Sequence, residues 1–135
     1  MTTTTSTSTS ILLVGPTWDA ADGTSQRGDV LITDGVIAQV GTVEAPGDAE
    51  RVEADGLRLL PGFVDLHTHL REPGREDAET IASGSRAAAV GGYTAVLAMA
   101  NTNPVTDTAE AAERILDLGR AAGLVDVVPI GAVTK

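Results

Sequence analysis

Two histidines one residue apart, His67 and His69, are the residues of this chain whose types and spacing most favour chemistry. They are the only histidines among its 135 residues, and they lie in the stretch DLHTHLREPG, between Asp65 and Arg71. Imidazole nitrogens are common ligands of Zn²⁺. The chain has no cysteine, so a metal site would be left to His, Asp, Glu or water. The stretch therefore makes a metal site the first hypothesis.

Alternation along a strand strengthens this hypothesis. One side of an extended strand here would collect Phe63, Asp65, His67, His69 and, if the extension continues, Arg71. We expect His67 and His69 to bind one metal ion and Asp65 to orient one imidazole. The alternative is an ordinary hydrogen-bonded histidine, which is the usual role of a single one. Two on one face favour the metal, because so many polar groups would otherwise stay unsatisfied.

The elements that would position these residues change in kind at residues 61–62. Before them, the dipeptide Asp34-Gly35 lies between two apolar, β-branched runs in VLITDGVIAQVG, which predicts a hairpin. The Asp55-Gly56 dipeptide in RVEADGLRLLPG repeats this signal and predicts a second such unit. We therefore expect residues 11–60 to form a small β module, preceded by a disordered Thr/Ser-rich tail over residues 1–10.

After residue 62 the pattern is that of βα units on a parallel sheet. Strands are predicted at FVDL, YTAVLAM and LVDVVPI. Helices are predicted from Ala78 to Val90, closed by Gly91-Gly92, and from Asp107 to Ala122, opened by a Thr/Asp cap and closed by Gly123. Three strands and two helices make neither a closed barrel nor a comfortable open sheet. We expect residues 61–135 to be the beginning of a larger α/β domain, truncated after the third strand; the alternative is a complete three-stranded domain.

Composition excludes several classes of function. The formal net charge is −10, from 9 basic and 19 acidic residues, and the basic ones are not clustered. Nucleic acid is therefore not an expected partner. The start MTTTTSTSTS lacks the basic region of a signal peptide, and the apolar ILLVG behind it is too short to span a membrane. We expect a cytoplasmic protein without membrane contact, which the absence of cysteine suits.

The stretches PGFVDLHTHLREPG and GSRAAAVGGYTAVLAMANTNPVTD resemble the amidohydrolase superfamily and, within it, the dihydroorotases of the longer, type I kind. The resemblance is dense over residues 60–107 and looser over the β module and the third strand. It implies a (β/α)8 barrel with two zinc ions and a β-sandwich module that includes residues 11–60. It also implies that His67 and His69 bind zinc, and that Arg71 and Asn101 hold a substrate carboxylate.

Two positions depart from the family's pattern, and several functional residues are absent. Ala100 replaces the proline of an MPNT segment, and Ala78 replaces a lysine that commonly precedes the glutamate. Neither position is a ligand in that pattern. The family's other ligands and its proton-shuttling aspartate belong to later strands, and this chain has no third histidine. No catalytic base is therefore expected within the chain; it is expected beyond Lys135, and the 135-residue piece alone is expected to be inactive.

The reaction implied by the resemblance is the zinc-dependent, reversible cyclisation of N-carbamoyl-L-aspartate to (S)-dihydroorotate in pyrimidine synthesis. The expected assemblies are a homo-oligomer or an association with aspartate carbamoyltransferase. One alternative is another cyclic amidohydrolase, an allantoinase or a hydantoinase, although allantoinase-like sequences have asparagine in place of Arg71. A second is a non-catalytic dihydroorotase-like partner protein, which would be expected to lose the metal histidines. A third is an inactive α/β domain, which predicts no metal uptake.

Overall fold

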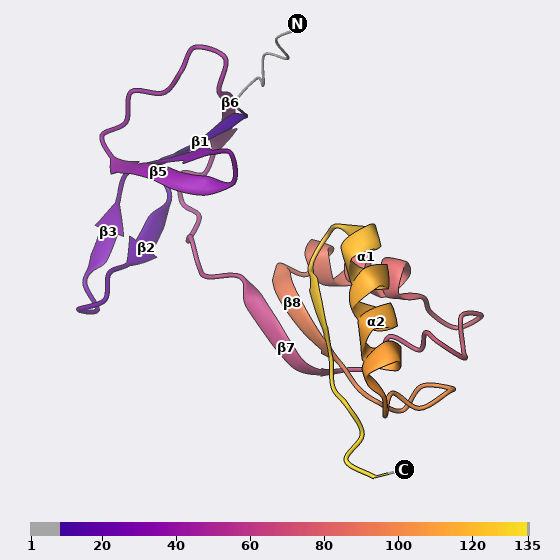
Figure 1. The fold of residues 1–135 in the computed structure, drawn as a ribbon. Coiled ribbons are helices and arrows are strands. Elements are labelled where there is room, and N and C mark those ends of the chain that lie inside the picture. The colour runs from indigo at the N-terminus through magenta and orange to yellow at the C-terminus, as the bar shows by residue number, and fades with distance from the viewer. Residues whose placement is uncertain (1–8, 135) are drawn as a thin grey trace, which may run out of the picture. The chain divides into compact units, whose positions relative to one another are not determined.

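The structure is a computed structural model that describes residues 9–134. The chain divides into two compact units, Met1–Leu60 and Pro61–Lys135 (Figure 1). In the described part of the chain, no helix is both long and apolar enough to cross a membrane.

From residue 9 onward, the first unit contains six strands: β1 (Ser10–Val14), β2 (Thr17–Asp19), β3 (Ser25–Arg27), β4 (Asp29–Thr33), β5 (Val36–Gly41) and β6 (Glu50–Glu53). Four of them form a sheet in the order β5-β4-β1-β6, whereas β2 and β3 form a two-stranded ribbon. The hairpin between β4 and β5 is confirmed. Asp34 and Gly35 have φ values of 51° and 79°, because a tight turn that matches the strand twist needs positive φ at both central residues.

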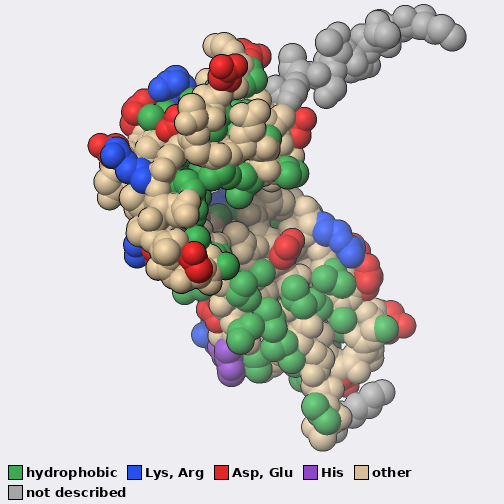
Figure 2. All heavy atoms as spheres, turned by 90° about the vertical axis from the view of Figure 1, so that its left-hand side faces the viewer, with side chains coloured by type: hydrophobic (Ala, Val, Ile, Leu, Met, Phe, Trp, Pro, Cys, Tyr) green, Lys and Arg blue, Asp and Glu red, His purple; other side chains and the backbone are tan. Residues whose placement is uncertain are grey.

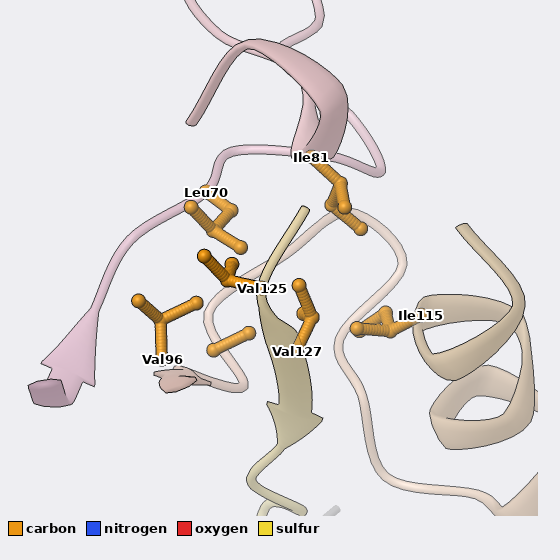
Figure 3. Close-up of a cluster of buried hydrophobic side chains, with 7 residues drawn as sticks. Leu70, Ile81, Val96, Ile115, Val125 and Val127 are labelled. Carbon is orange, nitrogen blue, oxygen red and sulfur yellow. The ribbon is translucent and has the colours of Figure 1, made fainter. Parts of the chain in front are cut away.

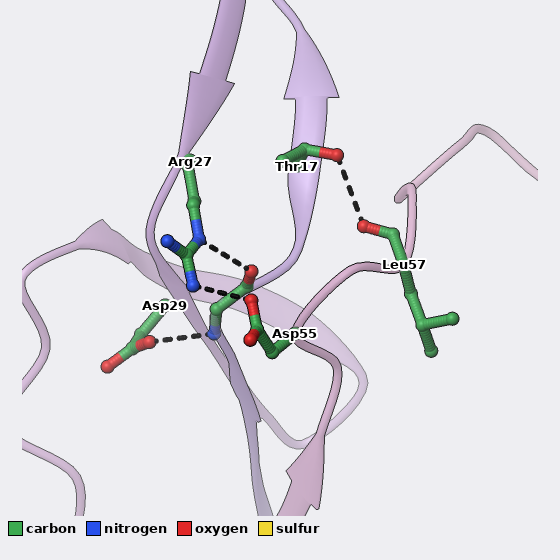
Figure 4. A network of polar contacts seen from close by, with 6 residues as sticks. Thr17, Arg27, Asp29, Asp55 and Leu57 are labelled. Carbon is green, nitrogen blue, oxygen red and sulfur yellow. Dashed lines mark hydrogen bonds and ion pairs between the residues drawn. The ribbon is translucent and has the colours of Figure 1, made fainter.

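Two expectations for this unit are corrected. Asp55-Gly56 is a turn, but it does not join two paired strands, because β6 pairs in parallel with β1. The chain after Gly56 instead runs beside Thr17, whose backbone N–H and hydroxyl both donate to the carbonyl of Leu57 (Figure 4). The disordered tail predicted over residues 1–10 also ends too late. Ser10 already belongs to β1 and pairs with Thr33; residues 1–8 lie outside the described residues.

Polar contacts around Gly15 join the turns of this unit (Figure 4). The Gly15 N–H donates to the Asp29 carboxylate at 3.0 Å, and its carbonyl accepts from Arg27 Nε at 3.3 Å. Arg27 also forms an ion pair with Asp55, in the turn after β6. Because this pair is largely exposed, we expect it to contribute little to stability.

The second unit alternates strands and helices: β7 (Phe63–Thr68), α1 (Ile81–Val90), β8 (Tyr93–Ala98), α2 (Ala109–Ala122) and β9 (Asp126–Pro129). The strands are parallel and in sequence order, which confirms the predicted βα units. The two connections run between neighbouring parallel strands and have the same right-handed sense, so they place both helices on the same face of the sheet. Figure 1 shows α1 and α2 together on that face.

The helix ends follow from their caps. Gly123, at φ 64°, closes α2 as predicted, and Thr108 opens it by accepting from Ala111 N–H at 3.2 Å. Helix α1 begins three residues later than the predicted Ala78, because Thr80 is its N-cap and accepts from Ser83 N–H at 3.1 Å. The preceding residues are held in a turn by bonds to the carbonyl of Arg75.

A single apolar cluster holds the helices on the sheet (Figure 3). Its members come from the loop after β7, from all the later elements and from the segment before β9: Leu70, Ile81, Val96, Ala98, Ile115, Val125 and Val127. The helix α2 approaches β9 closely at Gly119, where an added Cβ would lie 2.7 Å from the Cβ of Val127. The cluster lies between the helices and the sheet, and the loops that follow the strands form the edge of the sheet at their carboxyl ends.

Candidate metal and carboxylate site

Strand β7 has an extra residue just before the second histidine. Asp65 pairs with Val96 and Thr68 pairs with Ala98, so three steps along β7 match two along β8. Paired residues of parallel strands direct their side chains to the same face. Because Val96 and Ala98 are buried in the cluster under the helices, Asp65 and Thr68 lie on the helix side. Both line a cavity there together with Gly84 of α1.

This bulge corrects the expectation that Asp65 shares one face with His67. An extra residue interrupts the two-residue alternation, so positions before and after it are no longer in phase. The Asp65 carboxylate accepts from the backbone N–H of His67 at 2.9 Å. In the described residues, Asp65 therefore fixes the main chain at His67, and its hydrogen bond is to the backbone and not to an imidazole.

The two imidazoles lie side by side, with His67 within the bulge and His69 just after it. Their ring centroids are 5.1 Å apart and their planes are inclined by 62°. Both side chains are exposed, and Figure 2 shows the histidines at the edge of an apolar surface. Exposed apolar residues of β7 and β9, namely Phe63, Val64, Leu66 and Val128, belong to the same unit. The imidazole nitrogens are therefore accessible to a metal ion.

A hydrogen bond joins His69 to the next βα loop. His69 Nδ1 lies 2.8 Å from Asn101 Oδ1. The loop that presents Asn101 is held from both sides, because Met99 N–H donates to the carbonyl of Thr68 at 2.9 Å and Thr106 N–H donates to that of Ala100 at 3.1 Å. The predicted proximity of the two loops at the strand ends is thus seen in a direct side-chain contact.

Arg71 is placed by a backbone that has left the extended conformation. Its φ is 63°, an uncommon value for a residue with a Cβ, and such values often accompany functional sites. The neighbouring carboxylates have other partners: Glu72 accepts from Ile81 N–H at 2.7 Å, and Glu76 accepts from Gly74 N–H at 2.9 Å. The Gly74 bond holds the pKa of the Glu76 carboxyl below its ordinary value. Within residues 9–134, Arg71 has no ion pair, so the salt bridge with Glu72 or Glu76 that would compete with a substrate role is absent from this part of the chain.

A cavity of about 130 Å³ brings most of the predicted residues together. It is lined by His69, Arg71, Pro73, Arg75, Met99, Asn101, Thr102 and Asn103. His67 does not line the cavity, but its ring lies next to that of His69. Asp65 lies on the other face of the sheet. The lining thus combines two arginines with two asparagines and a histidine. Such donors suit a small anion, above all a carboxylate.

Sequence reasoning missed Arg75. The Arg75 N–H donates to the carbonyl of Arg71 at 2.9 Å, so the two residues are four apart in a single turn. Arginines on both sides of the Pro-Gly turn in REPGR were the available signal, since a tight turn brings the residues that flank it close together. In the described part of the chain Arg75, like Arg71, has no ion pair, although the chain as a whole is strongly acidic.

The residues present fit a metal ion in part. A ligating histidine usually donates from its second ring nitrogen to an oxygen, and Asn101 Oδ1 offers such an acceptor to His69. Across residues 9–134, no group of three or more His, Cys, Asp or Glu side chains is close enough to hold a metal. The described residues therefore provide two ligands of a site and not a complete one.

Comparison with known structures finds a similar fold in hydantoinases and dihydropyrimidinases. The L-hydantoinase (dihydropyrimidinase) of Arthrobacter aurescens aligns with a TM-score of 0.71 and 26% identity, over 90% of this chain and 27% of that one. The dihydropyrimidinase of Brevibacillus agri aligns with a TM-score of 0.74 and 27% identity, over 93% and 28%. The fold is thus that of one portion of these amidohydrolases.

The sequence comparisons are more specific. A family model described as dihydro-orotase-like matches residues 56–135, and the chain belongs to this family. It is 59% identical over 113 residues to the dihydroorotase of Mycobacterium tuberculosis, which covers 83% of this chain and 26% of the relative. It is 63% identical over 106 residues to that of Streptomyces coelicolor, covering 78% and 25%. The chain thus spans about a quarter of the length of these curated relatives.

Proposed function

We propose that this chain forms the first part of a zinc-dependent dihydroorotase. The whole enzyme would interconvert N-carbamoyl-L-aspartate and (S)-dihydroorotate, with loss of water on ring closure. The family membership supports the class of reaction. The observation that carries the choice of substrate is the cavity in which Arg71, Arg75 and Asn101 gather without a carboxylate partner among the described residues.

In this proposal Arg71 and Asn101 hold the carboxylate of the substrate. A guanidinium group can form two parallel hydrogen bonds to a carboxylate, and the Asn101 side-chain N–H groups can donate a third. Fixing this carboxylate places the ring carbonyl beside the histidines, because His69 lines the same cavity. Positioning of this kind removes much of the entropic barrier to the reaction.

His67 and His69 are the proposed ligands of one zinc ion. Zinc, when bound, lowers the pKa of water and polarises a carbonyl oxygen. Further metal ligands and the residue that moves the proton are assigned to segments beyond residue 135, as is the rest of a (β/α)8 barrel. We also propose two zinc ions per complete site, a β-sandwich module that includes residues 11–60, a cytoplasmic location, and assembly as a homo-oligomer or with aspartate carbamoyltransferase.

A second candidate is hydrolysis of an uncharged cyclic amide, since the structural relatives carry the names hydantoinase and dihydropyrimidinase. Arg71 and Arg75, which have no ion pair within residues 9–134, favour the first candidate, because an uncharged ring gives them no partner. Dihydroorotate and dihydrouracil differ only by the ring carboxylate, so this pair of substrates separates the two functions.

The test uses the protein that carries this chain, with both substrates followed by the ultraviolet absorbance of the ring. We expect turnover of dihydroorotate, little turnover of dihydrouracil, loss of activity on chelation and recovery when Zn²⁺ is returned. A preference for dihydrouracil would favour the second candidate. Zinc-loaded protein that turns over neither substrate would contradict both.

A further inference from the structure

We infer that Asn101 is a positioning residue for the metal ligand His69, in addition to any contact with the substrate. Its side-chain oxygen holds the imidazole in the tautomer with a proton on Nδ1, so that Nε2 keeps its lone pair for the metal. The inference rests on the proposed function for the metal at His69 and for the identity of the anion. Its physical basis is the contact of 2.8 Å between His69 Nδ1 and Asn101 Oδ1.

Hydrogen-bond chemistry links this contact to the tautomer. A neutral imidazole has one N–H donor and one acceptor nitrogen, and an amide oxygen can only accept. If Asn101 Oδ1 faces Nδ1, then Nδ1 must carry the proton. If the amide were turned over, its NH₂ group would donate to Nδ1, and the proton of the ring would be on Nε2. The two orientations of one amide therefore make opposite predictions for the metal-binding nitrogen.

The cavity favours the first orientation. With Oδ1 towards His69, the Asn101 NH₂ group is left without a hydrogen-bond partner within residues 9–134 and is free to donate to an anion. The cavity also contains Arg71 and Arg75, whose guanidinium groups attract an anion. An amide oxygen facing that anion would repel it, whereas the NH₂ group adds donors. One side chain can thus serve both neighbours, with its oxygen on the ligand and its nitrogen on the anion.

The loop around Asn101 holds this geometry in place. The Thr102 hydroxyl donates to the carbonyl of Pro104 at 2.7 Å and lies 2.9 Å from the hydroxyl of Thr106, which is fully buried. On the other side, Met99 N–H donates to the carbonyl of Thr68, the residue before His69. Hydrogen bonds hold the backbone next to Asn101 and the backbone next to His69, so the two side chains meet without a rearrangement of either loop.

The first measurement is the tautomer of His69 in the metal-free protein. Ring nitrogens are observed by NMR after ¹⁵N labelling of histidine, about two pH units above the ordinary imidazole pKa of about 6.5. The His69 signals are identified as those missing from His69→Gln. We expect a protonated Nδ1 and an unprotonated Nε2. A proton on Nε2 would overturn the inference.

The second measurement separates the two atoms of the Asn101 amide by substitution. Asn101→Asp keeps an oxygen acceptor for Nδ1–H but removes the NH₂ donors, whereas Asn101→Ala removes both. We expect Asn101→Ala to weaken Zn²⁺ binding by about 10- to 100-fold in competition with a chelator, as is usual when a partner of a ligating histidine is lost. Asn101→Asp should keep the tautomer and bind Zn²⁺ at least as tightly as the unchanged protein.

Gln39→Ala is the control, because it removes an exposed side-chain amide that does not line the cavity. It should leave Zn²⁺ affinity unchanged. Equal affinity in Asn101→Ala and the unchanged protein, or equal losses in the Ala and Asp variants, would overturn the inference. If Asn101→Ala does not fold, the tautomer and the Asp variant still decide it. Neither readout needs dihydroorotate turnover, so a wrong substrate would be recognised separately.

Discussion

The backbone N–H of Asn103 donates to the carbonyl of Pro73 at 2.9 Å and so joins the loop after β7 to the loop after β8. These loops carry Arg71 and Asn101, respectively. Gly74 makes the approach possible: its φ is 109°, and an added Cβ would lie 2.6 Å from the backbone oxygen of Asn103. The distance between the two substrate-binding candidates therefore depends on a glycine that does not itself line the cavity.

Gly74→Ala should destabilise the protein and separate the two loops. The left-handed backbone and the overpacking against Asn103 together should lower the free energy of unfolding by about 2–4 kcal/mol. Denaturant unfolding measures this change. Gly131→Ala is the control, because no neighbouring atom lies within 4 Å of its added Cβ and its φ is not positive. An unchanged unfolding midpoint in Gly74→Ala would show that the loops do not need this approach.

His67→Ala should remove one zinc ion and the turnover together. Zinc content is measured by elemental analysis and turnover with dihydroorotate. Thr68→Val is the matched control between the two histidines, since the Thr68 side chain lies on the helix side and its buried hydroxyl has no hydrogen-bond partner in the described residues. Replacing an unsatisfied hydroxyl by a methyl group should be neutral or stabilising. Normal activity and zinc content in His67→Ala would remove His67 from the site.

Arg71→Met should lower kcat/KM for dihydroorotate by about 30-fold or more, equivalent to at least about 2 kcal/mol, because a charged partner of the carboxylate is lost. Any residual rate with dihydrouracil should change much less. Arg75→Met should cause a smaller loss that decreases as salt is raised, since a guanidinium that acts at longer range is screened.

Arg86→Met provides the comparison for both arginine variants. Arg86 is an exposed residue of α1 and does not line the 130 Å³ cavity, and it has no ion pair in the described part of the chain. It carries the same change of charge. If all three variants behaved alike with dihydroorotate, the effect would come from net charge, and neither Arg71 nor Arg75 would belong to the anion site.

Local signals predicted much of this fold. The Asp34-Gly35 hairpin and the ends of α2 at Thr108 and Gly123 depend on turn and cap chemistry within a few residues. The Asp55-Gly56 dipeptide carried the same turn signal but lacked a pairing strand behind it. Instead of a second hairpin, the structure has β6 paired in parallel with β1, and this pairing joins residues about forty apart in the sequence.

The candidate site was predictable in its members and less so in its geometry. Histidine spacing and the family resemblance selected His69, Arg71 and Asn101, which line one cavity. The side on which Asp65 lies was not predictable, because alternation assumes an uninterrupted strand and the bulge arises from pairing with β8. Only that pairing shows that the residues before and after the bulge are out of phase.

The extra residue in β7 makes chain length as important as side-chain identity at this position. Shortening the strand by one residue, for instance at Leu66, would restore a regular pairing of Asp65 and its successors with β8. Because Thr68 would stay opposite Ala98, the change would fall on His67, which lies within the bulge. This segment should therefore accept exchanges of its apolar residues more readily than any insertion or deletion, and protein engineering here should treat the number of residues between Asp65 and His69 as fixed.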